Sequence, residues 1–463
     1  MRLHWHRRDL RLTDNPALVC DSEPVVGCLI HDPAITDSVG STRLAFYRNA
    51  VDALSADYRD RGGQLILRRG DPRQELSTLT TELGADYVSW EADYTGFATR
   101  RDRKVRTTLQ RDDIEVAIRD GAVFHPPGTI TTTDGTPYKV FGYYGRKWLD
   151  REKASPDDPP DEVIEPAVVT STTFADRTDA EPQEPSLPEA GTVPATRLLE
   201  AFCDGPIFQY AVDRDRPAAD ATSRLSPHLS HGTVGIRTVW ERTARAMERA
   251  EDEAARDSVT EFRRQLAWRE FYTQVLWDRP DAITESIRDF SRPIEWRDDQ
   301  AGLRAWKDGR TGFPIVDAGM RQLLADGWMH NRLRMIVASF LTKDLLVDWR
   351  EGYRWFRDRL VDHDTANDVG GWQWAASTGT DAQPYFRIFN PITQGERYDP
   401  DATYIKRYVP ELADVPAAVI HSWNELTTPD RDEHAPNYPA PILDHAHRRE
   451  LAIEMYETAI DGN

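Results

Sequence analysis

Two stretches organise this chain: WMHNRLRMIVASFLTKDLLVDWR (328–350) and LVDHDTANDVGGWQWAASTGTDAQPYFRIFNPITQ (360–394). Together with the residues between them, they mix tryptophan with polar side chains that are costly to bury. The tryptophans are Trp328, Trp349, Trp355, Trp372 and Trp374, and the polar side chains are Asn331, Arg334, Asp362, Asp364 and Asp368. Aromatic walls around convergent polar groups predict a pocket for a large planar ligand. The alternative is an ordinary helical core whose charges lie on solvated faces.

The segment 329–342 has the apolar spacing of a buried helix. Asn331 and Arg334 are three residues apart, so they share one face of that helix, close to its apolar stripe. A buried guanidinium group requires an acidic partner. We predict that the triplet Asp362–Asp364, on a loop after a helix at 355–360, supplies this partner.

Residues 1 to about 150 alternate short apolar runs with helical patterns. We expect strands at 3–6, 25–30, 64–67, 87–90 and 115–118. We also expect a helix that Ser41 caps and that runs through Arg59, and a second helix that begins at Pro72. This βαβ alternation predicts a parallel, doubly wound sheet.

The rest of the chain divides by composition. Residues 151–195 are rich in proline, acidic residues, serine and threonine, which is typical of an extended connection along the surface. From residue 196 onward the pattern is helical and contains eleven of the fourteen tryptophans. The sequence therefore predicts an α/β domain at 1–150, a linker at 151–195 and an all-α domain at 196–463.

Several common functions are disfavoured. The chain contains neither G-x-G-x-x-G nor G-x-x-x-x-G-K-[ST], which argues against an ordinary nicotinamide-dependent or nucleotide-hydrolysing role. No apolar run approaches the length of about 18 residues typical of a membrane span, and the charged opening is no signal peptide, so we expect a cytoplasmic protein without membrane contact. Cys20, Cys28 and Cys203 lack the spacing of a zinc site or a disulfide framework. We expect them to be small core residues, and we expect no metal.

The formal net charge of −20 is unusual for a protein that binds nucleic acid by neutralising phosphates. Either the partner is not DNA, or the acidity is an adaptation to high salt, where charges are screened within about 3 Å at molar ionic strength. We favour the adaptation to salt, because arginines cluster at positions 263, 264 and 269 and at positions 332 and 334.

Two segments of the helical region have the chemistry of binding sites. The polar stretch 210–226 contains Pro217, so it cannot be one continuous helix. Its hydroxyl groups near 222–226 suit a pyrophosphate, although such residues more often form caps and turns. A helix is predicted at 261–277, where Arg264, Gln265 and Trp268 recur at helical spacing and can form a small recognition face. The alternative there is a core helix with a polar edge.

The two stretches at 328–350 and 360–394 resemble the DNA photolyase and cryptochrome family. The same family is resembled by three further motifs: TSRLS at 222–226, LAWREFY at 266–272 and GRTGFPIVDAGMRQL at 309–323. Within it they are most similar to the class I cyclobutane pyrimidine dimer photolyases. The resemblance runs from HWHRRDLRLTDNPAL at 4–18 to DHAHRRE at 444–450. It implies a light-dependent carbon–carbon lyase that repairs UV-damaged DNA, with FAD in the helical domain. It also implies an antenna pigment, a deazaflavin or a folate, in the α/β domain that HRRDLR at 6–11 marks. We expect a monomer.

The resemblance also assigns roles to residues. The FAD-binding positions are Tyr210, Thr222, Ser223, Arg224, Leu225, Ser226, Arg269, Asn331, Arg334, Asp362, His363, Asp364 and Asp368. The positions that contact the lesion or nearby DNA are Arg214, Gln265, Trp268, Arg269, Tyr272, Asn331, Arg332, Met335, Trp374 and Gln394. The residues with catalytic roles are Asn331, Asp368 and a tryptophan relay of Trp296, Trp349 and Trp372 that brings electrons from the surface to the flavin. Each of these tryptophans, taken alone, is more often core packing.

The implied chemistry depends on the cofactor. A cyclobutane dimer splits after it accepts one electron, and no side chain is a strong enough donor, so a reduced and photoexcited flavin has to supply that electron. The damaged bases leave the stack to reach the flavin, and their poor stacking makes this extrusion cheap.

Two positions depart from the expected pattern. Gln265 stands where the resemblance leads us to expect a glutamate, as in enzymes that repair (6-4) photoproducts, but the segment HNRLRMI lacks their additional histidine. Asp368 stands where an asparagine is typical, and an aspartate beside the flavin is a feature of plant cryptochromes, which signal rather than repair. Asp368 can alternatively cap a turn. Cyclobutane dimer repair is therefore the first expectation, with a blue-light photoreceptor, a (6-4) photolyase or a light-independent flavin oxidoreductase as alternatives.

Overall fold

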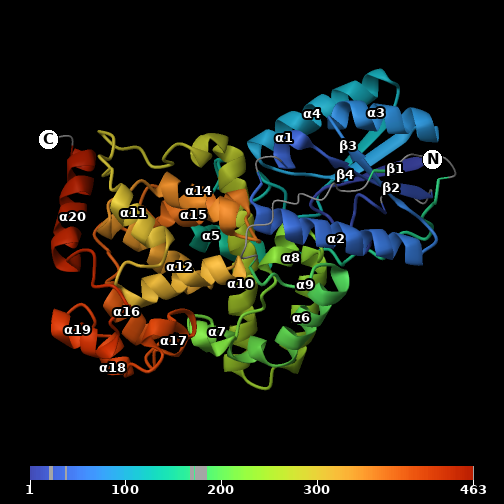
Figure 1. Cartoon of the computed structure of the whole chain (residues 1–463). Coiled ribbons are helices and arrows are strands. Elements are labelled where there is room, and N and C mark those ends of the chain that lie inside the picture. Colours follow the sequence, from blue (N-terminus) through green and yellow to red (C-terminus); the bar gives the residue numbers. More distant parts are fainter. Residues whose placement is uncertain (20–23, 37–38, 167–170, 173–184, 462–463) are drawn as a thin grey trace.

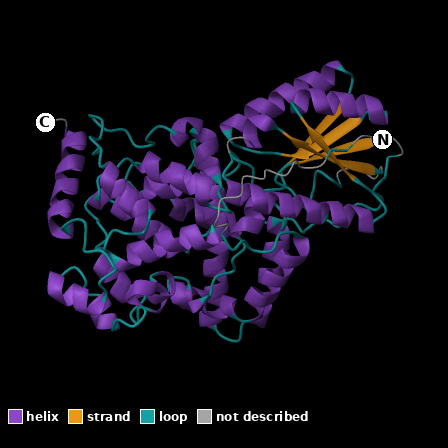
Figure 2. Ribbon diagram, in the orientation of Figure 1, coloured by secondary structure: helices purple, strands orange, loops and turns teal. Residues whose placement is uncertain are grey.

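The computed structural model describes residues 1–19, 24–36, 39–166, 171–172 and 185–461. An α/β domain at the N-terminal end lies beside a larger helical domain (Figure 1). Within the described residues, the strands all belong to the N-terminal domain (Figure 2). The predicted combination of a parallel doubly wound sheet with an all-α domain is confirmed.

The five strands form one parallel sheet in the order β3-β2-β1-β4-β5. They are β1 (Arg2–His6), β2 (Val25–His31), β3 (Leu65–Arg69), β4 (Tyr87–Glu91) and β5 (Glu115–Arg119). The predicted strands are thus confirmed to within two residues at each end. Leu3 of β1 is paired with Val26 on one side and with Val88 on the other. The strand order reverses direction at β1, so the loops that follow β1 and β4 flank a crevice at the carboxyl edge of the sheet.

Helices cover both faces of the sheet. α2 (Ser41–Asp60) lies on one face, and α3 (Pro72–Leu83) and α4 (Gly96–Arg111) lie on the other (Figure 1); the short α1 (Pro33–Thr36) follows β2. The side chains of a strand point alternately to the two faces of the sheet. Leu29 accordingly packs with the apolar side chains of α2, and Val26 packs with those of α3 and α4. The helix that starts at Pro72 is confirmed. The prediction that Ser41 caps α2 is wrong, because Gly40 occupies the N-cap and no side chain caps that helix.

A buried polar network fixes the loop after β1. His4 Nε2 lies 2.8 Å from Asp9 Oδ2, and His6 Nε2 lies 2.8 Å from the hydroxyl oxygen of Tyr58. Asp9 also accepts from the backbone N–H of Arg7 over 2.7 Å. Burial opposes ionisation of Asp9, but the two histidines hold the pKa of its carboxyl group well below the usual range. These three side chains have the spacing of a metal-binding group. In this structure they bond to one another and to Ser89, Tyr58 and Asn15, and so hold the loop that carries Arg7 and Arg8.

The helical domain is built from many short helices around a long one. They are α5 (Phe141–Asp150), α6 (Thr192–Asp204), α7 (Tyr210–Asp213), α8 (Ser226–His231), α9 (Ile236–Arg249), α10 (Glu253–Asp278), α11 (Gln300–Lys307), α12 (Pro314–Asp326), α13 (Asn331–Ser339), α14 (Trp349–Arg359), α15 (Thr365–Ala375), α16 (Pro391–Tyr398), α17 (Thr403–Tyr408), α18 (Ala417–Ile420), α19 (Thr428–His434) and α20 (His445–Asp461). Single 3₁₀ turns are η1 (Pro206–Gln209), η2 (Pro217–Ala219), η3 (Pro280–Ile283) and η5 (Pro410–Leu412), and a π-helical turn, η4 (Phe340–Asp344), continues α13.

The long helix α10 joins the parts of this domain. Its apolar face shares one core with α5, α6 and α9, and α15 packs against it from another side. A Cβ on Gly370 of α15 would lie 2.2 Å from the Tyr272 ring of α10, so the two helices approach as closely as they do because residue 370 is glycine. The stretch 210–226 is broken into α7, η2 and the start of α8, as its proline predicts.

The connection between the two domains has little regular structure where it is described. Residues 151–166 and 185–191 contain no helix, and Val163 forms an isolated parallel bridge with Val25. The boundaries at residues 150 and 195 stay predictions. Cys28 and Cys203 are buried and free, as expected for core residues, and Cys20 lies outside the described residues. In the described part of the chain, no helix has the length and apolarity that a bilayer crossing requires.

Candidate functional site

A cavity of about 390 Å³ opens between α10, α13 and α15, and we call it the main cavity. Its lining residues are Arg214, Gln265, Trp268, Tyr272, Asn331, Arg334, Met335, Ala338, Phe356, Asn367, Asp368, Gly371, Trp372 and Trp374. Nine of the residues predicted for flavin, lesion or DNA contact are in this set, together with Trp372 of the predicted relay. The volume and the aromatic walls are typical of a site for a drug-sized planar ligand.

The α13 wall presents the polar face predicted from sequence. Asn331 begins the helix, and its Nδ2 lies 3.8 Å from Sδ of Met335 one turn later. Arg334 Nη2 donates to Asp362 Oδ2 over 2.7 Å, and its Nε donates to the carbonyl oxygen of Met329. The predicted acidic partner for this guanidinium group is therefore confirmed. The second oxygen of Asp362, Oδ1, is buried and has no protein partner.

The α10 wall supplies an aromatic platform. The Trp268 ring stacks on Phe141 of α5 with 3.7 Å between ring centroids and 11° between the planes, so one face of Trp268 is covered. Tyr272 flanks it with 5.4 Å between centroids. Trp374 lines the same cavity from α15. Arg264, predicted to share the recognition face with Gln265 and Trp268, is not among the cavity residues and is about half exposed.

The α15 wall carries the only carboxyl group among the described cavity residues, Asp368. Its Oδ2 is hydrogen-bonded to His363 Nδ1 at 2.5 Å, and its Oδ1 lies 3.9 Å from Arg334 Nη1. The alternative that Asp368 caps a turn is wrong, because Asp364 is the N-cap of α15 and accepts from the backbone N–H of Asn367. Asp368 instead lies inside the helix, within reach of a cation and of a histidine.

The predicted relay residues belong to one core cluster but differ in exposure. Trp372 lines the cavity, Trp349 is fully buried and Trp296 is partly exposed. A Cβ on Gly352 would lie 2.0 Å from Trp372 Cη2, so this glycine lets the Trp372 ring pack against α14, the helix that begins at Trp349. The Trp372 ring also contacts Trp306, with 6.1 Å between centroids.

The TSRLS segment lies outside the main cavity, at the start of α8. Ser226 Oγ accepts from Trp328 Nε1 over 3.0 Å, and the Arg224 guanidinium lies 3.9 Å from the centre of the Trp328 ring. Arg224 has a φ of +54°, a left-handed conformation that is uncommon for a residue other than glycine. Leu225 is buried, and Thr222 and Ser223 are partly exposed. The segment is therefore a tightly held turn with accessible hydroxyl groups.

Two of the other predicted DNA contacts, Arg332 and Arg214, are paired with acidic neighbours. Arg332 Nη2 pairs with Asp215 Oδ2 at 2.7 Å, and its guanidinium lies 4.3 Å from the Tyr398 ring centre. Gln394 is on α16, and its Oε1 is buried without a protein partner. Arg214 pairs with Glu261.

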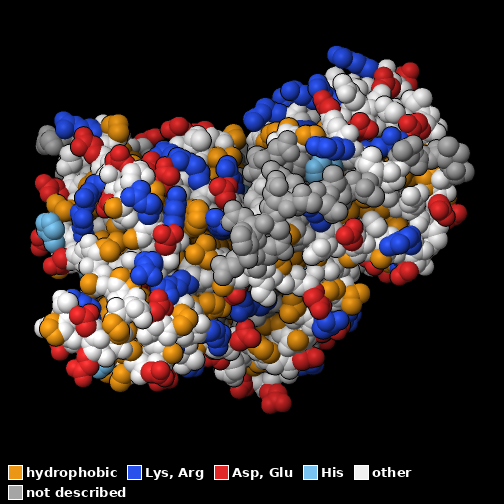
Figure 3. Space-filling model, in the orientation of Figure 1, with side chains coloured by type: hydrophobic (Ala, Val, Ile, Leu, Met, Phe, Trp, Pro, Cys, Tyr) orange, Lys and Arg blue, Asp and Glu red, His pale blue; other side chains and the backbone are white. Residues whose placement is uncertain are grey.

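The arginines that cluster in the sequence, at 263, 264 and 269 and at 332 and 334, are for the most part only partly exposed in the structure. Arg264 is the most exposed of them, whereas Arg332 and Arg334 are only 14% and 21% exposed. Arg269 donates from Nη1 to the carbonyl oxygen of Ala122 over 2.6 Å, across the domain boundary. Acidic and basic side chains are mixed over the face shown in Figure 3.

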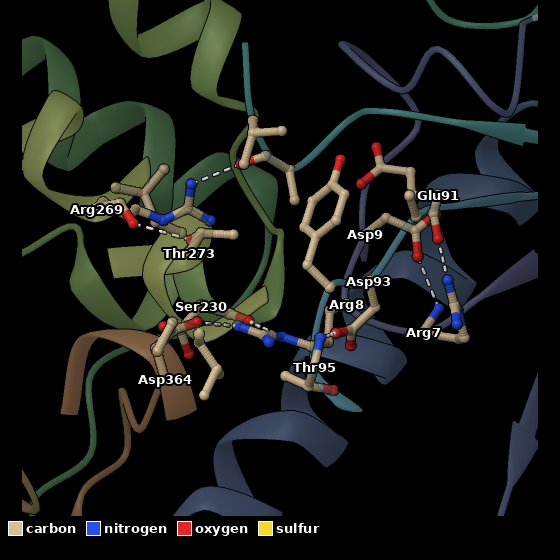
Figure 4. Close-up of a pocket in the computed structure, with 17 residues that line it drawn as sticks. Arg7, Arg8, Asp9, Glu91, Asp93, Thr95, Ser230, Arg269, Thr273 and Asp364 are labelled. Carbon is tan, nitrogen blue, oxygen red and sulfur yellow. Dashed lines mark hydrogen bonds and ion pairs between the residues drawn. The ribbon is translucent and has the colours of Figure 1, made fainter. Parts of the chain in front are cut away.

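A small crevice of about 60 Å³ lies where the domains meet. Figure 4 shows Arg269 and Asp364 of the helical domain across this crevice from Arg8 and Asp93 of the α/β domain. Arg8 Nη2 pairs with Asp364 Oδ2 at 2.7 Å, and Arg8 Nε donates to the carbonyl oxygen of Ser230. Burial opposes ionisation of Asp364, but Arg8 and Arg269 outweigh it and hold the pKa of this carboxyl group below its usual range. Two predicted FAD-binding residues, Arg269 and Asp364, thus also join the domains.

A second crevice of about 260 Å³ lies at the carboxyl edge of the sheet, and we call it the sheet crevice. Aromatic side chains line it, with the guanidinium groups of Arg8 and Arg43. Burial, with Arg8 nearby, lowers the pKa of Arg43 to about 10, and in the described chain Arg43 forms no hydrogen bond or ion pair. His363 also lines this crevice, so the His363–Asp368 hydrogen bond connects it to the main cavity.

Comparison with known proteins agrees with this architecture. A family profile described as "DNA photolyase" matches residues 2–164, and one described as "FAD binding domain of DNA photolyase" matches residues 262–458. A deoxyribodipyrimidine photo-lyase from Halobacterium salinarum is 52% identical to this chain, with 99% of each sequence covered. The enzyme of that name from Escherichia coli is 36% identical, again with 99% of each covered.

Solved structures give the same result. A bacterial class III photolyase from Agrobacterium tumefaciens superposes with a TM-score of 0.92 at 36% identity, covering 99% of this chain and 97% of that one. An archaeal photolyase from Sulfolobus tokodaii, solved with two FAD molecules, superposes with a TM-score of 0.81 at 29% identity, with 99% of each chain covered. The fold, the site and these matches are those of a light-dependent flavin enzyme. The chain belongs to the DNA photolyase family. The class I subgroup stays a prediction.

The residues present fit FAD. Asp362 Oδ1 is a buried acceptor without a partner, beside an arginine that lines a cavity of about 390 Å³, and a ligand with polar donors would satisfy it. Sequence reasoning missed Asn367 and Phe356 of the cavity, Arg43 of the sheet crevice, and Glu261 behind Gln265. The interdomain contacts of Arg8 were also missed, because the motif HRRDLR was taken only as a marker of the α/β domain.

Proposed function

We propose that the protein uses light and bound FAD to split cyclobutane pyrimidine dimers in UV-damaged DNA. The observation that carries this proposal is the main cavity, in which Gln265, Trp268, Trp374, Asn331 and Asp368 line one chamber between three helices. Deoxyribodipyrimidine photo-lyases are similar to the chain along its whole length, which supports the same substrate class.

Two groups of residues hold the cofactor. Arg334, Asp368 and Asn331 line the cavity and bind the flavin ring, and Asp362 supports them through its ion pair with Arg334. Tyr210 and the turn 222–226 bind the phosphates through backbone and hydroxyl groups. Arg269, His363 and Asp364 support this set from the domain boundary. When bound, reduced FAD supplies the photoexcited electron that no side chain can provide.

The lesion occupies the outer part of the same cavity. Trp268 and Trp374 form its aromatic walls, since Trp268 offers one free face and Trp374 lies on the opposite helix. Stacking on aromatic rings stabilises an extruded base by about 1–3 kcal/mol. Met335, Tyr272 and Gln265 complete the contact surface, and Arg214, Arg332 and Gln394 flank the opening. The protein thus positions the lesion and excludes water, and the cofactor performs the electron chemistry.

Trp372, Trp349 and Trp296 load electrons into the site. Two observations support this role. Trp372 lines the cavity, Trp349 is buried and Trp296 is partly exposed. The Trp372 ring also packs closely against α14 at Gly352. A core-packing role alone gives no reason for the last member to be accessible to an external reductant.

The sheet crevice binds a second pigment. The crevice lies at the carboxyl edge of a parallel sheet and has an aromatic lining. These features, with the cation Arg43, which forms no ion pair among the described residues, suit a planar ligand with a negative group. A folate carboxylate or a flavin phosphate has this character, and a neutral deazaflavin does not use Arg43. The Sulfolobus tokodaii photolyase contains two FAD molecules. Absorption spectra of the protein, and of Arg43→Gln loaded with each pigment, test this assignment.

One observation favours a second candidate, a blue-light photoreceptor. Asp368 lines the main cavity and is hydrogen-bonded to His363, so it can control protonation of a bound ligand. A cryptochrome from Synechocystis has the same fold, with a TM-score of 0.90 at 24% identity. A (6-4) photolyase is disfavoured because the segment 330–336 contains a single histidine.

The net charge of −20 fits a protein that works in high salt, where long-range repulsion of DNA is screened. Binding then depends on short-range contacts in the cavity more than on a basic surface. Cys28 and Cys203 are free, which suits the reducing cytoplasm. Residues of this chain line the main cavity, and we propose that the protein is a monomer. Sedimentation of the FAD-loaded protein tests the monomer.

The test of the proposed function compares two lesions in identical flanking DNA. Protein loaded with FAD and reduced chemically is mixed with an oligonucleotide that carries one thymine dimer or one (6-4) product, in light and in darkness. The proposal expects light-dependent repair of the thymine dimer only. Repair of the (6-4) product alone, or of neither lesion, contradicts it.

A further inference from the structure

Gln265 and Glu261 form a hydrogen-bonded pair on α10 at the wall of the main cavity. Gln265 Nε2 donates to Glu261 Oε1 over 2.9 Å and to the Glu261 carbonyl oxygen over 3.3 Å. Gln265 lines the cavity, whereas Glu261 is one helical turn earlier and is not among the lining residues. The carboxylate therefore lies behind the amide as seen from the cavity.

Two arginines fix the position of Glu261. Its Oε1 also pairs with Nη1 of Arg214, and its Oε2 lies 3.7 Å from Nε of Arg264. The Arg214 guanidinium lies 5.4 Å from the centre of the Tyr210 ring, so it is itself held in place. Glu261 cannot turn away from Gln265 without losing these contacts.

The chemistry of the partners decides which way the Gln265 amide faces. A carboxylate paired with guanidinium groups only accepts hydrogen bonds, so the nitrogen end of the amide has to face Glu261. An inverted amide would bring its carbonyl oxygen against Glu261 Oε1 and lose the bonds that Nε2 donates. In the described chain no hydrogen bond reaches Gln265 Oε1. The free end of the amide is therefore an acceptor without a partner.

We propose that Glu261 is a positioning residue that holds Gln265 as a fixed hydrogen-bond acceptor, so that the pair selects dimers whose bases carry an imide N–H. This inference rests on the proposed function. Thymine has a donor at N3, whereas cytosine has an acceptor there. A glutamine that is free to invert can accept from N3–H of thymine or donate to N3 of cytosine. A glutamine held with its oxygen towards the cavity can only accept, and so binds thymine. Dimers of two thymines are thus favoured over dimers that contain cytosine.

The pair also explains how a glutamine can replace the glutamate expected at position 265. A glutamate there is an acceptor in either orientation, whereas a lone glutamine is not. Glu261 restores the single orientation and keeps the negative charge one turn away from the cavity wall. The cavity then presents a neutral acceptor, which costs less to desolvate against an apolar lesion than a carboxylate does.

The test compares a thymine–thymine dimer with a thymine–cytosine dimer in the same flanking DNA, before the cytosine is deaminated. For FAD-loaded protein, two ratios are measured: the dissociation constants in darkness and the single-turnover repair rates in light. In Glu261→Gln the new amide can donate or accept, so only the longer bond of 3.3 Å to the backbone carbonyl of residue 261 still favours one orientation of Gln265. The inverted amide then becomes accessible, and both ratios fall about tenfold towards one. Release of Arg214 affects both lesions equally and cancels in the ratio.

Two further variants separate positioning from a structural role. Asp257→Asn removes an exposed negative charge one turn earlier on α10 and leaves both ratios unchanged. Glu261→Gln combined with Gln265→Glu restores a group that only accepts, and both ratios return to the wild-type preference. A role limited to folding gives no such rescue.

The inference is overturned if Glu261→Gln keeps the wild-type ratios, or if the double variant does not regain them. Failure of the proposed function has a different signature: neither dimer is repaired in light. The binding ratios in darkness still decide the role of Glu261 in that case.

Discussion

Replacing Arg334 with methionine leaves the Asp362 carboxylate buried without its cationic partner. The two groups are 2.7 Å apart, and the Asp362 side chain is only 2% exposed. Its other oxygen already lacks a protein partner, so in Arg334→Met neither oxygen is paired with a cation. We therefore expect a large loss of stability from a substitution that adds no bulk.

The magnitude follows from the burial of the pair. Removing one partner of a buried ion pair costs about 3–5 kcal/mol, because the remaining charge is left in a medium of low dielectric constant. The Arg334 side chain is 21% exposed, so water reaches that side and the loss is at the lower end of the range. We expect a decrease of about 3 kcal/mol in the free energy of unfolding.

Urea unfolding of the flavin-free protein measures this quantity directly. Arg354→Met is the matched control: Arg354 also pairs at 2.7 Å, with Glu351, but the two side chains are 53% and 35% exposed. Its loss should cost less than about 1 kcal/mol. Arg334→Met combined with Asp362→Asn removes the buried charge as well and should recover most of the stability.

Equal stability of Arg334→Met and Arg354→Met would refute the reasoning, because it would mean that Asp362 is solvated or neutral without Arg334. Failure of the double variant to recover stability would show that the arginine acts through packing and not through charge. The amount of bound flavin, measured in parallel by absorbance, should fall in Arg334→Met even if the free energy of unfolding does not change.

Three further outcomes are expected. Trp372→Phe should abolish photoreduction of oxidised FAD but leave repair by chemically reduced protein intact, because the relay only loads the electron; a parallel loss of both activities, with flavin retained, would make Trp372 structural. Asp368→Asn should preserve repair and change the flavin absorption spectrum reached under blue light, since the amide keeps a contact with His363 but cannot supply a carboxyl proton; an unchanged spectrum would remove Asp368 from the flavin chemistry. Stability should fall as the pH drops below about 6.5. Burial lowers the pKa of several histidines to about 4 or below. Below the ordinary histidine pKa, the unfolded chain therefore binds protons that the folded chain does not. Each such histidine lowers the free energy of unfolding by up to about 1.4 kcal/mol per pH unit. They are His4, His228, His231 and His330. A flat urea midpoint between pH 7 and 5 would contradict the buried neutral state of these rings.

The sequence predicted the features that depend on local pattern. Strand positions followed from short apolar runs, and the parallel order followed from their alternation with helices. The pairing of Arg334 with Asp362 was predictable because a buried guanidinium group requires an acid and the triplet at 362–364, on a loop after a helix, could supply one. The residues of the main cavity were found mainly through the resemblance to photolyases.

The features that the sequence did not predict depend on contacts between distant segments. Arg8 and Asp364 are 356 positions apart, and nothing in their local pattern pairs them. The hydrogen bond between His363 and Asp368 was missed because the sequence suggested only a flavin contact or a turn cap for the aspartate, and Asp364 is the cap. The π-helical turn at Phe340–Asp344 was also missed, since its apolar spacing resembles that of an ordinary helix.

The most direct test of the central claim is single-turnover repair of one defined thymine dimer by the FAD-loaded, chemically reduced protein under blue light. The assay is run in high salt, with a dark sample and with Trp268→Ala as controls. Our account predicts restored thymines in the light, none in the dark, and a loss of dimer affinity of about tenfold or more in the variant, from the removal of one stacking wall. Reduced, FAD-loaded protein that binds the dimer and leaves it intact under light would contradict the assignment as a repair enzyme and favour a photoreceptor.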